Sequence, residues 1–196
     1  MLWLIVNVGF GIRLSKPQSL PKTFTSNTFP DLKYNNSISN QDKIQLVEDL
    51  AFAADNFLKN KILVTPYIWV IVPTPSSKDR ELQPVYLLAD KIAYLLNRRI
   101  DGEYIKKIKN TNELKSIEIL EERKKILDGA FICDKRYKGR KILLIDDLYR
   151  SGATLNEITK TLYTQGEVDN VYVLCFTKTR SKKWIMKKFL FQDLFL

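Results

Sequence analysis

The chain has 196 residues, of which 45% are hydrophobic and 28% charged, and its formal net charge is +10. This length and composition are typical of a globular protein that buries its own core, and we expect a single domain over residues 1–196. Because the chain contains no histidine, a Ser-His-Asp triad and a histidine-ligated zinc site are both excluded.

The first twelve residues are apolar but lack a preceding basic region and a small-residue cleavage site, so we expect a strand there and not a signal peptide. No apolar run reaches the roughly 18 residues of a transmembrane helix, and no membrane partner is predicted. Residues 14–40 are rich in Ser, Thr, Asn and Pro, which is typical of a long irregular loop. We expect residues 1–40 and 178–196 to cover a core formed by residues 62–177.

Apolar periodicity predicts the elements of this core. Helical spacing of apolar residues predicts a helix over 41–60 and another over 85–96. Between them, the continuous apolar run 68–72 predicts a buried strand that ends at the prolines of 73–75. Residues 100–128 are highly charged, and we expect an amphipathic helix within them. We also expect a short strand over 130–133 and the last core strand over 171–176. This order predicts an α/β fold with a mainly parallel sheet.

The two cysteines, Cys133 and Cys175, lie in apolar, strand-like contexts and not in a spaced framework. We interpret them as reduced core residues, which predicts a cytoplasmic protein without a disulfide or a zinc site.

The most informative segment is KILLIDDLYRSGATLNEI, residues 141–158. Four apolar residues, 142–145, predict a strand covered on both faces, and Asp146 and Asp147 then stand at the carboxyl edge of the sheet, where open α/β sheets bind ligands. A loop with small residues and Gly152 leads into a helix, whose first amides can hold a phosphate. Each residue also suits a strand followed by an ordinary helix cap, but their order favours a ribose-phosphate site.

This segment closely resembles the phosphoribosyl-pyrophosphate (PRPP) motif of type I phosphoribosyltransferases. The resemblance implies a three-layer fold with helices on both faces of the sheet and a small hood from the termini. It implies that Asp146 and Asp147, the catalytic pair, hold the ribose hydroxyls. The 5′-phosphate would be bound by the loop after them: Tyr149, Arg150, Ser151, Gly152, Ala153 and Thr154.

A second loop follows the strand at 68–72 and has the sequence PTPSSKDR, residues 73–80. In type I phosphoribosyltransferases a loop at this place binds pyrophosphate, and hydroxyls and cations suit a leaving group that gains charge. The residues carried over are Thr74, Pro75, Ser76, Ser77, Lys78 and Arg80. Pro, Ser and Lys are also ordinary residues of surface loops.

Residues 70–154 resemble the ComF family, phosphoribosyltransferase-like proteins named for a role in bacterial DNA uptake. The likeness consists of Pro-Thr-Pro at 73–75, a basic stretch that leads to Thr111, Glu122–Arg123 ahead of Ala130–Phe131, and the Asp-Asp…Ser-Gly-Ala-Thr loop. The family's usual arginines in the basic stretch are replaced by Lys107 and Lys109, and its frequent zinc-binding Cys module is absent. The acceptor and the partner therefore stay open.

By resemblance, the expected activity is that of a pentosyltransferase: a nitrogen base displaces pyrophosphate from PRPP with the help of Mg²⁺. The ion would be held chiefly by the ligand, with Asp146 and Asp147 as the candidate protein ligands. A flexible loop closes over the site in this family, and residues 106–122 are the candidate, with Lys107 and Lys109 as phosphate contacts or simply as part of a solvated basic turn. A homodimer is left open.

The alternative function keeps the fold without catalysis, as a PRPP- or nucleotide-sensing module that binds single-stranded DNA or a DNA-processing protein. The basic, aromatic tail 178–196 supports this alternative, since single-strand binders combine cations with aromatic rings. The same tail also suits an amphipathic lid over the sheet, and the net charge of +10 alone is equally typical of a lysine-rich surface.

Overall fold

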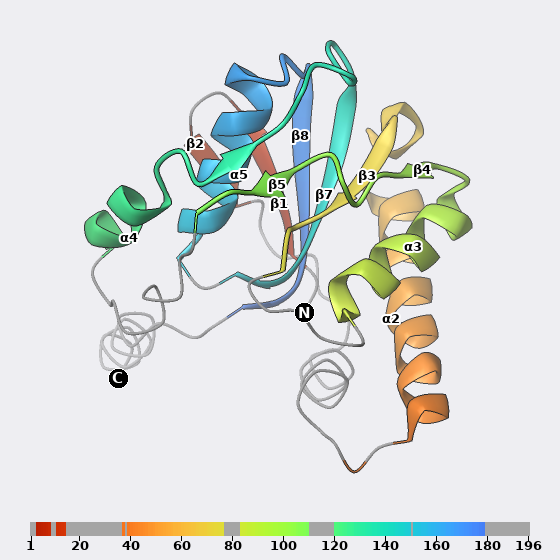
Figure 1. The fold of residues 1–196 in the computed structure, drawn as a ribbon. Helices are drawn as coiled ribbons and strands as arrows, with labels where there is room; N and C mark the ends of the chain where they lie inside the picture. Colours follow the sequence, from red (N-terminus) through yellow and green to blue (C-terminus); the bar gives the residue numbers. More distant parts are fainter. Residues whose placement is uncertain are drawn as a thin grey trace, which may run out of the picture.

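In this computed structural model, the described residues are 3–8, 11–14, 37, 39–76, 83–109, 120–149 and 151–178. They form a three-layer α/β arrangement in which helices cover both faces of a central sheet (Figure 1). Its strand order is β2-β1-β8-β7-β3-β4, with a separate two-stranded ribbon, β5-β6. The predicted α/β fold class is confirmed.

Four strands of the central sheet run parallel. They are β3 (Val70–Pro73), β4 (Arg99–Ile100), β7 (Lys141–Tyr149) and β8 (Asn170–Lys178). In β7, Ile142 and Leu144 pack on one face of the sheet, while Leu143 and Ile145 pack on the other. Burial on both faces explains why this strand reads as an uninterrupted apolar run in the sequence.

The remaining two strands of this sheet, β1 (Trp3–Val8) and β2 (Gly11–Leu14), are antiparallel. The strand expected in the first twelve residues is therefore present, but β1 and β2 do not form a separate cover. They extend the central sheet, because β1 pairs with the edge of β8 that β7 leaves open. Pairing satisfies backbone groups that a bare edge would expose.

One face of the sheet is covered by α2 (Asn40–Lys61) and α3 (Pro84–Leu96), as the two apolar stripes predict. Ser39 caps α2 by accepting a hydrogen bond from the Asp42 amide, and Asn97 ends α3 in the left-handed conformation. A short 3₁₀ turn, η1 (Thr65–Tyr67), leads from α2 into β3.

The other face is covered by α5 (Ala153–Thr164), with α4 (Leu120–Leu127) and the ribbon of β5 (Lys106–Lys107) and β6 (Phe131–Ile132) beside it (Figure 1). Three apolar residues of α5 are buried there: Leu155, Ile158 and Leu162. The rest of the expected cover, residues 15–36 and 179–196, lies outside the described residues. Among the described helices, none combines the length and apolar character that a bilayer crossing needs.

Candidate functional site

The candidate site lies where β3 ends against β7. Pro73, the last residue of β3, is paired with Ile145, and the Thr74 amide donates to the Ile145 carbonyl at 2.9 Å. Thr74 therefore emerges beside Asp146. The sequence predicted that the strand ends at the two acids. In the structure β7 continues through both acids to Tyr149, because β8 runs alongside it as far as Lys178.

Asp146 is joined directly to the loop after β3. The Thr74 hydroxyl donates a hydrogen bond of 2.8 Å to Asp146 Oδ1, and the Thr74 side chain is buried while Asp146 is half-buried. The acid predicted to hold the ribose and the first polar residue of the predicted pyrophosphate loop thus touch each other.

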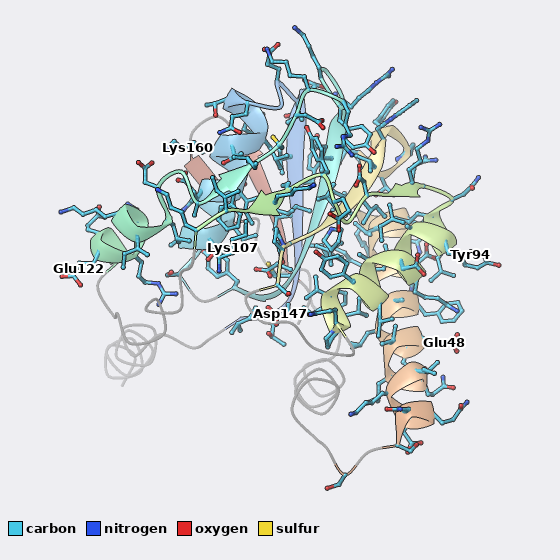
Figure 2. All side chains as sticks on the ribbon, viewed as in Figure 1. Glu48, Tyr94, Lys107, Glu122, Asp147 and Lys160 are labelled. Carbon is cyan, nitrogen blue, oxygen red and sulfur yellow. The ribbon has the colours of Figure 1, made fainter. Side chains whose placement is uncertain are left out.

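Asp147 lies at the carboxyl end of β7 (Figure 2), and its carbonyl accepts a hydrogen bond of 2.8 Å from the Thr177 hydroxyl of β8. Because successive strand residues point to opposite faces, Asp146 is directed to the α5 face and Asp147 to the α2–α3 face. A ligand that binds both carboxylates therefore lies across the edge of the sheet. No motif in the sequence pointed to Thr177, which is 30 residues beyond Asp147.

Beside Asp146, on the neighbouring strand β8, lies its register partner Cys175. Burial, and secondarily the charge of Asp146, raises the pKa of the Cys175 thiol well above its usual value. Both cysteines are free thiols, as predicted, with Cys175 buried and Cys133 half-buried.

The predicted phosphate loop runs from Tyr149 to Thr154. Gly152 has φ +76° and is the N-cap of α5, whose first residue is Ala153. A Cβ at Gly152 would lie 2.9 Å from the Tyr149 ring, so this position needs glycine for its backbone and for the close ring. The Ala153 amide makes a long hydrogen bond of 3.5 Å to Ser151 Oγ. The loop therefore presents the start of a twelve-residue helix beside the two acids.

The residues of this loop differ in burial and in what they contact. Tyr149 packs its ring against Gly152, and burial raises the pKa of its hydroxyl. Ser151 and Thr154 are half-buried, whereas Arg150 lies outside the described residues. Tyr149 thus has a packing role that the sequence did not indicate.

Of the predicted pyrophosphate loop, Thr74, Pro75 and Ser76 are described. Thr74 is buried, Pro75 half-buried and Ser76 exposed. Ser77, Lys78 and Arg80 lie outside the described residues.

The two lysines of the predicted closing loop are held differently. Lys107 is in β5, paired with Phe131 of β6, and burial lowers the pKa of its half-buried ammonium. Lys109 Nζ donates to the Asp128 carbonyl at 2.5 Å, and Asp128 also pairs with Lys160 of α5 at 2.6 Å. Residues 106–107 are thus strand, and in this structure Lys109 is bound to the turn after α4. Residues 110–119 lie outside the described residues.

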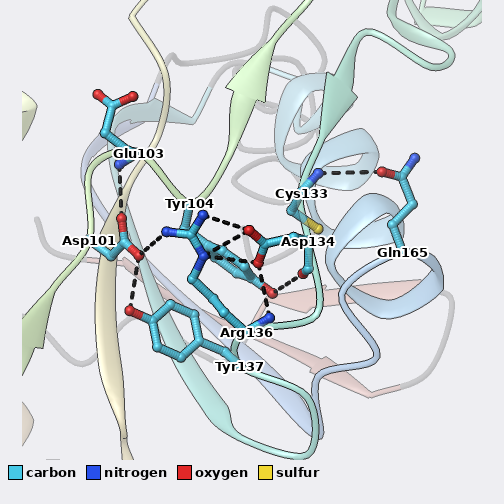
Figure 3. Close-up of polar contacts among 8 residues, drawn as sticks. All are labelled: Asp101, Glu103, Tyr104, Cys133, Asp134, Arg136, Tyr137 and Gln165. Carbon is cyan, nitrogen blue, oxygen red and sulfur yellow. Dashed lines mark hydrogen bonds and ion pairs between the residues drawn. The ribbon is translucent and has the colours of Figure 1, made fainter.

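A polar network that the sequence did not reveal joins the loops after β4 and β6 (Figure 3). Asp101 accepts hydrogen bonds from the Tyr137 hydroxyl at 2.9 Å and from Arg136 at 3.1 Å. Arg136 also pairs with Asp134, whose carbonyl accepts from the buried Tyr104 hydroxyl at 3.1 Å. This network fixes the base of the β5–β6 ribbon, and so the start of the predicted closing loop.

Comparisons with known proteins find relatives in sequence and in structure. No family model matches the chain. Competence protein F of Haemophilus influenzae is 29% identical over 103 residues, which cover 49% of this chain and 44% of that protein. Competence protein ComFC of Bacillus subtilis is 32% identical over 120 residues, which cover 58% of this chain and 45% of that protein. The matched region thus spans a little under half the length of these curated relatives.

Two solved structures are also similar, with lower sequence identity. One, from a study of an invariant aspartic acid in HPRTs, is 13% identical, with a TM-score of 0.42 over 72% of this chain and 79% of that one. The other, hypoxanthine phosphoribosyl transferase of Trypanosoma cruzi, is 14% identical. Its TM-score is 0.41 over 72% of this chain and 76% of that one. Likeness at this level supports no conclusion about function. The predicted resemblance to ComF proteins is confirmed, because the chain is similar in sequence to these two competence proteins over about half of its residues.

Proposed function

We propose that this protein binds PRPP and transfers its phosphoribosyl group to or from a nitrogen base in the presence of Mg²⁺. The observation that carries the proposal is the hydrogen bond between Thr74 and Asp146, which joins two segments that the sequence assigned separately to pyrophosphate and ribose. The Gly152 turn and the first residues of α5 follow β7 at the same edge of the sheet, and they would complete the site.

In the proposed reaction, the bond between C1 of the ribose and pyrophosphate breaks and a bond between C1 and a base nitrogen forms. The protein needs no nucleophile of its own, since positioning and charge stabilisation supply the rate enhancement. Asp146 and Asp147 would accept hydrogen bonds from the ribose hydroxyls. The amides at the start of α5 would donate to the 5′-phosphate. The Thr74 hydroxyl would keep Asp146 in place, and the Ser76 hydroxyl would face the leaving group.

The donor set suits a hard cation that is bound largely through its ligand. The carboxylates of Asp146 and Asp147 are oxygen ligands of the kind that Mg²⁺ prefers, and in the described part of the chain no cluster of three metal-ligating side chains occurs. When bound, Mg²⁺ would neutralise negative charge on the diphosphate. Asp146 and Asp147 are the residues that would hold it.

Calorimetric titration with PRPP and Mg²⁺ tests the binding step. We expect saturable binding that Asp146→Asn combined with Asp147→Asn abolishes, whereas Asp90→Asn, on the exposed face of α3, leaves it unchanged. Pyrophosphate release is then measured with a panel of nitrogen bases. Absence of PRPP binding by the folded wild-type protein would refute the proposal.

A second candidate is a non-catalytic module that senses PRPP or a nucleotide and acts in DNA uptake or processing. The specific observation in its favour is that both curated relatives are named competence proteins. PRPP binding without pyrophosphate release for any base would favour this sensor. Release that disappears with the two Asp→Asn substitutions would favour the enzyme.

A further inference from the structure

A cluster of arginine and aromatic side chains lies at the opposite edge of the sheet. Trp69 immediately precedes β3, Arg140 immediately precedes β7, and Arg99 is the first residue of β4. Since these three strands are parallel, their amino ends meet at one edge, and Asp147 lies at the other end of β7 (Figure 2). We call Tyr67, Trp69, Arg98, Arg99 and Arg140 the amino-edge patch.

The patch is built around the indole of Trp69. The guanidinium carbon of Arg140 lies 4.1 Å from the centroid of the Trp69 ring, and that of Arg99 lies 5.6 Å from it. Stacked in this way, a guanidinium keeps its in-plane N–H groups available to an anion. Trp69 is still 41% exposed and Tyr67 is 69% exposed, so both present ring surface to solvent.

The third arginine is held in place by backbone carbonyls. Arg98 Nη2 donates to the Pro66 carbonyl at 2.9 Å, and its Nη1 donates to the Asn97 carbonyl at 3.1 Å. These bonds fix the guanidinium next to the 3₁₀ turn that carries Tyr67. The cations and rings of the patch are thus positioned by the fold.

The positive charge of the patch is not neutralised within the described part of the chain, where no carboxylate forms an ion pair with Arg98, Arg99 or Arg140. The acids on the neighbouring turns are already engaged: Asp169 pairs with Lys141, and Glu167 pairs with Lys135 and Lys138. An anionic partner would therefore meet uncompensated guanidinium groups.

We propose that the amino-edge patch binds a single-stranded nucleic acid. Its phosphates would lie on the arginines, and its bases would stack on the exposed parts of Trp69 and Tyr67. Cations that follow a backbone, interleaved with aromatic rings, are the combination used for single strands, whose bases have accessible faces. A duplex keeps those faces inside its own stack and offers only charge. The patch is separate from the proposed PRPP site, so either proposal can fail without the other.

Fluorescence anisotropy with a short fluorescein-labelled oligothymidylate tests this inference on the full chain. We expect Arg99→Gln combined with Arg140→Gln to weaken binding about tenfold or more, and to lower the salt dependence by about 0.7 for each phosphate that the arginines no longer neutralise. Trp69→Ala should also weaken binding about tenfold, and Trp69→Phe should restore most of it. Thermal melting followed by circular dichroism verifies that each variant is folded.

Matched controls separate the patch from general charge. Lys124→Gln combined with Lys125→Gln removes the same charge from the exposed surface of α4 and should leave binding within about twofold of wild type. Asp146→Asn with Asp147→Asn should not weaken it. The proposal is overturned if the arginine variant binds as tightly as wild type, or if the lysine variant loses as much affinity as the arginine variant. It is also overturned if duplex DNA binds as tightly as the single strand, or if polyglutamate displaces the protein as well as a single strand does.

Discussion

The Thr74 hydroxyl donates a hydrogen bond of 2.8 Å to Asp146, although 72 residues separate the two in the chain. The contact follows from the register of β3 against β7. Pro73 is paired with Ile145, so the next residue of each strand must meet at the carboxyl edge. A buried hydroxyl that donates to a carboxylate holds that carboxylate in one orientation, and through it the loop after β3 is coupled to the ribose-binding acid of the proposed site.

Thr74→Val is expected to weaken PRPP binding about tenfold to hundredfold, because a hydrogen bond to a charged group is worth about 1.5–3 kcal/mol. The effect on unfolding should be smaller, since Asp146 is half-buried and water can replace the missing donor. Calorimetry with PRPP and Mg²⁺ measures the affinity, and urea unfolding measures the stability.

Thr74→Ser is the matched control for that substitution, since it keeps the hydroxyl and loses only a methyl group. It should retain affinity within a few-fold of wild type. If Thr74→Val binds PRPP as tightly as the wild-type protein does, the hydrogen bond has no part in the site.

Gly152→Ala should destabilise the protein by about 2–4 kcal/mol. A residue with a Cβ strains the left-handed backbone by about 1–2 kcal/mol, and the new methyl group would also meet the Tyr149 ring at 2.9 Å. PRPP affinity should fall as well, because the turn that begins α5 is displaced. Chemical unfolding and calorimetry measure the two effects.

Gly139→Ala provides the comparison for Gly152→Ala. Gly139 also has a left-handed backbone, with φ +67°, but no atom lies within 4 Å of the position that a Cβ would take. Gly139→Ala should lower the free energy of unfolding only by the backbone strain, about 1–2 kcal/mol, and leave PRPP binding unchanged. Equal costs at the two glycines would mean that the Tyr149 ring simply moves aside.

Elements whose burial is encoded locally were predictable from the sequence. The run at 142–145 is apolar without alternation because both faces of β7 are covered, and α5 shows its core face at helical spacing. Asp146, Asp147 and Gly152 could be proposed as site residues for a similar reason, since all three lie in one continuous segment whose order resembles a known motif.

Features that depend on pairing between distant segments were not predictable. The extension of β7 to Tyr149 requires β8 as a neighbour, and the addition of β1 to the sheet requires the open edge of β8. The stacking of Arg140 on Trp69 brings together the turns before two strands, each with an ordinary local sequence. Such contacts are set by register, which no single segment specifies.

The two cysteines should differ in reactivity towards a thiol reagent in the native protein at pH 8. Cys175 is fully buried, and its thiol pKa is raised well above the usual value, so we expect no reaction before unfolding. Cys133 is half-buried, and burial raises the pKa of its thiol, so it should react slowly.

Ellman's reagent provides the measurement for this difference, with Cys133→Ser as the control that leaves only Cys175. The raised pKa of Cys175 also predicts that its contribution to stability is complete below pH 9.0 and is lost as the pH rises through the folded-state value. Rapid labelling of native Cys133→Ser protein would show that Cys175 is accessible.

Because of Glu167, the stability of the protein should depend on pH in the acid range. Hydrogen bonds from Lys135, and then from Lys138, lower the pKa of its carboxyl group from 4.5 to about 2. Because the folded-state value is depressed, the stabilisation is complete above pH 4.5 and is lost as the pH falls towards 2. Glu167→Gln should therefore unfold at a lower urea concentration than wild type at pH 6, and this difference should narrow at pH 3.

Since Glu167 lies on the surface, added salt should reduce the difference at pH 6. Asp90→Asn removes an exposed carboxyl group that forms no ion pair with the described residues, and should leave the urea midpoint at pH 6 unchanged. A Glu167→Gln difference that stays constant from pH 6 to pH 3 would show that the two lysines stabilise the turn without selecting the charged carboxylate.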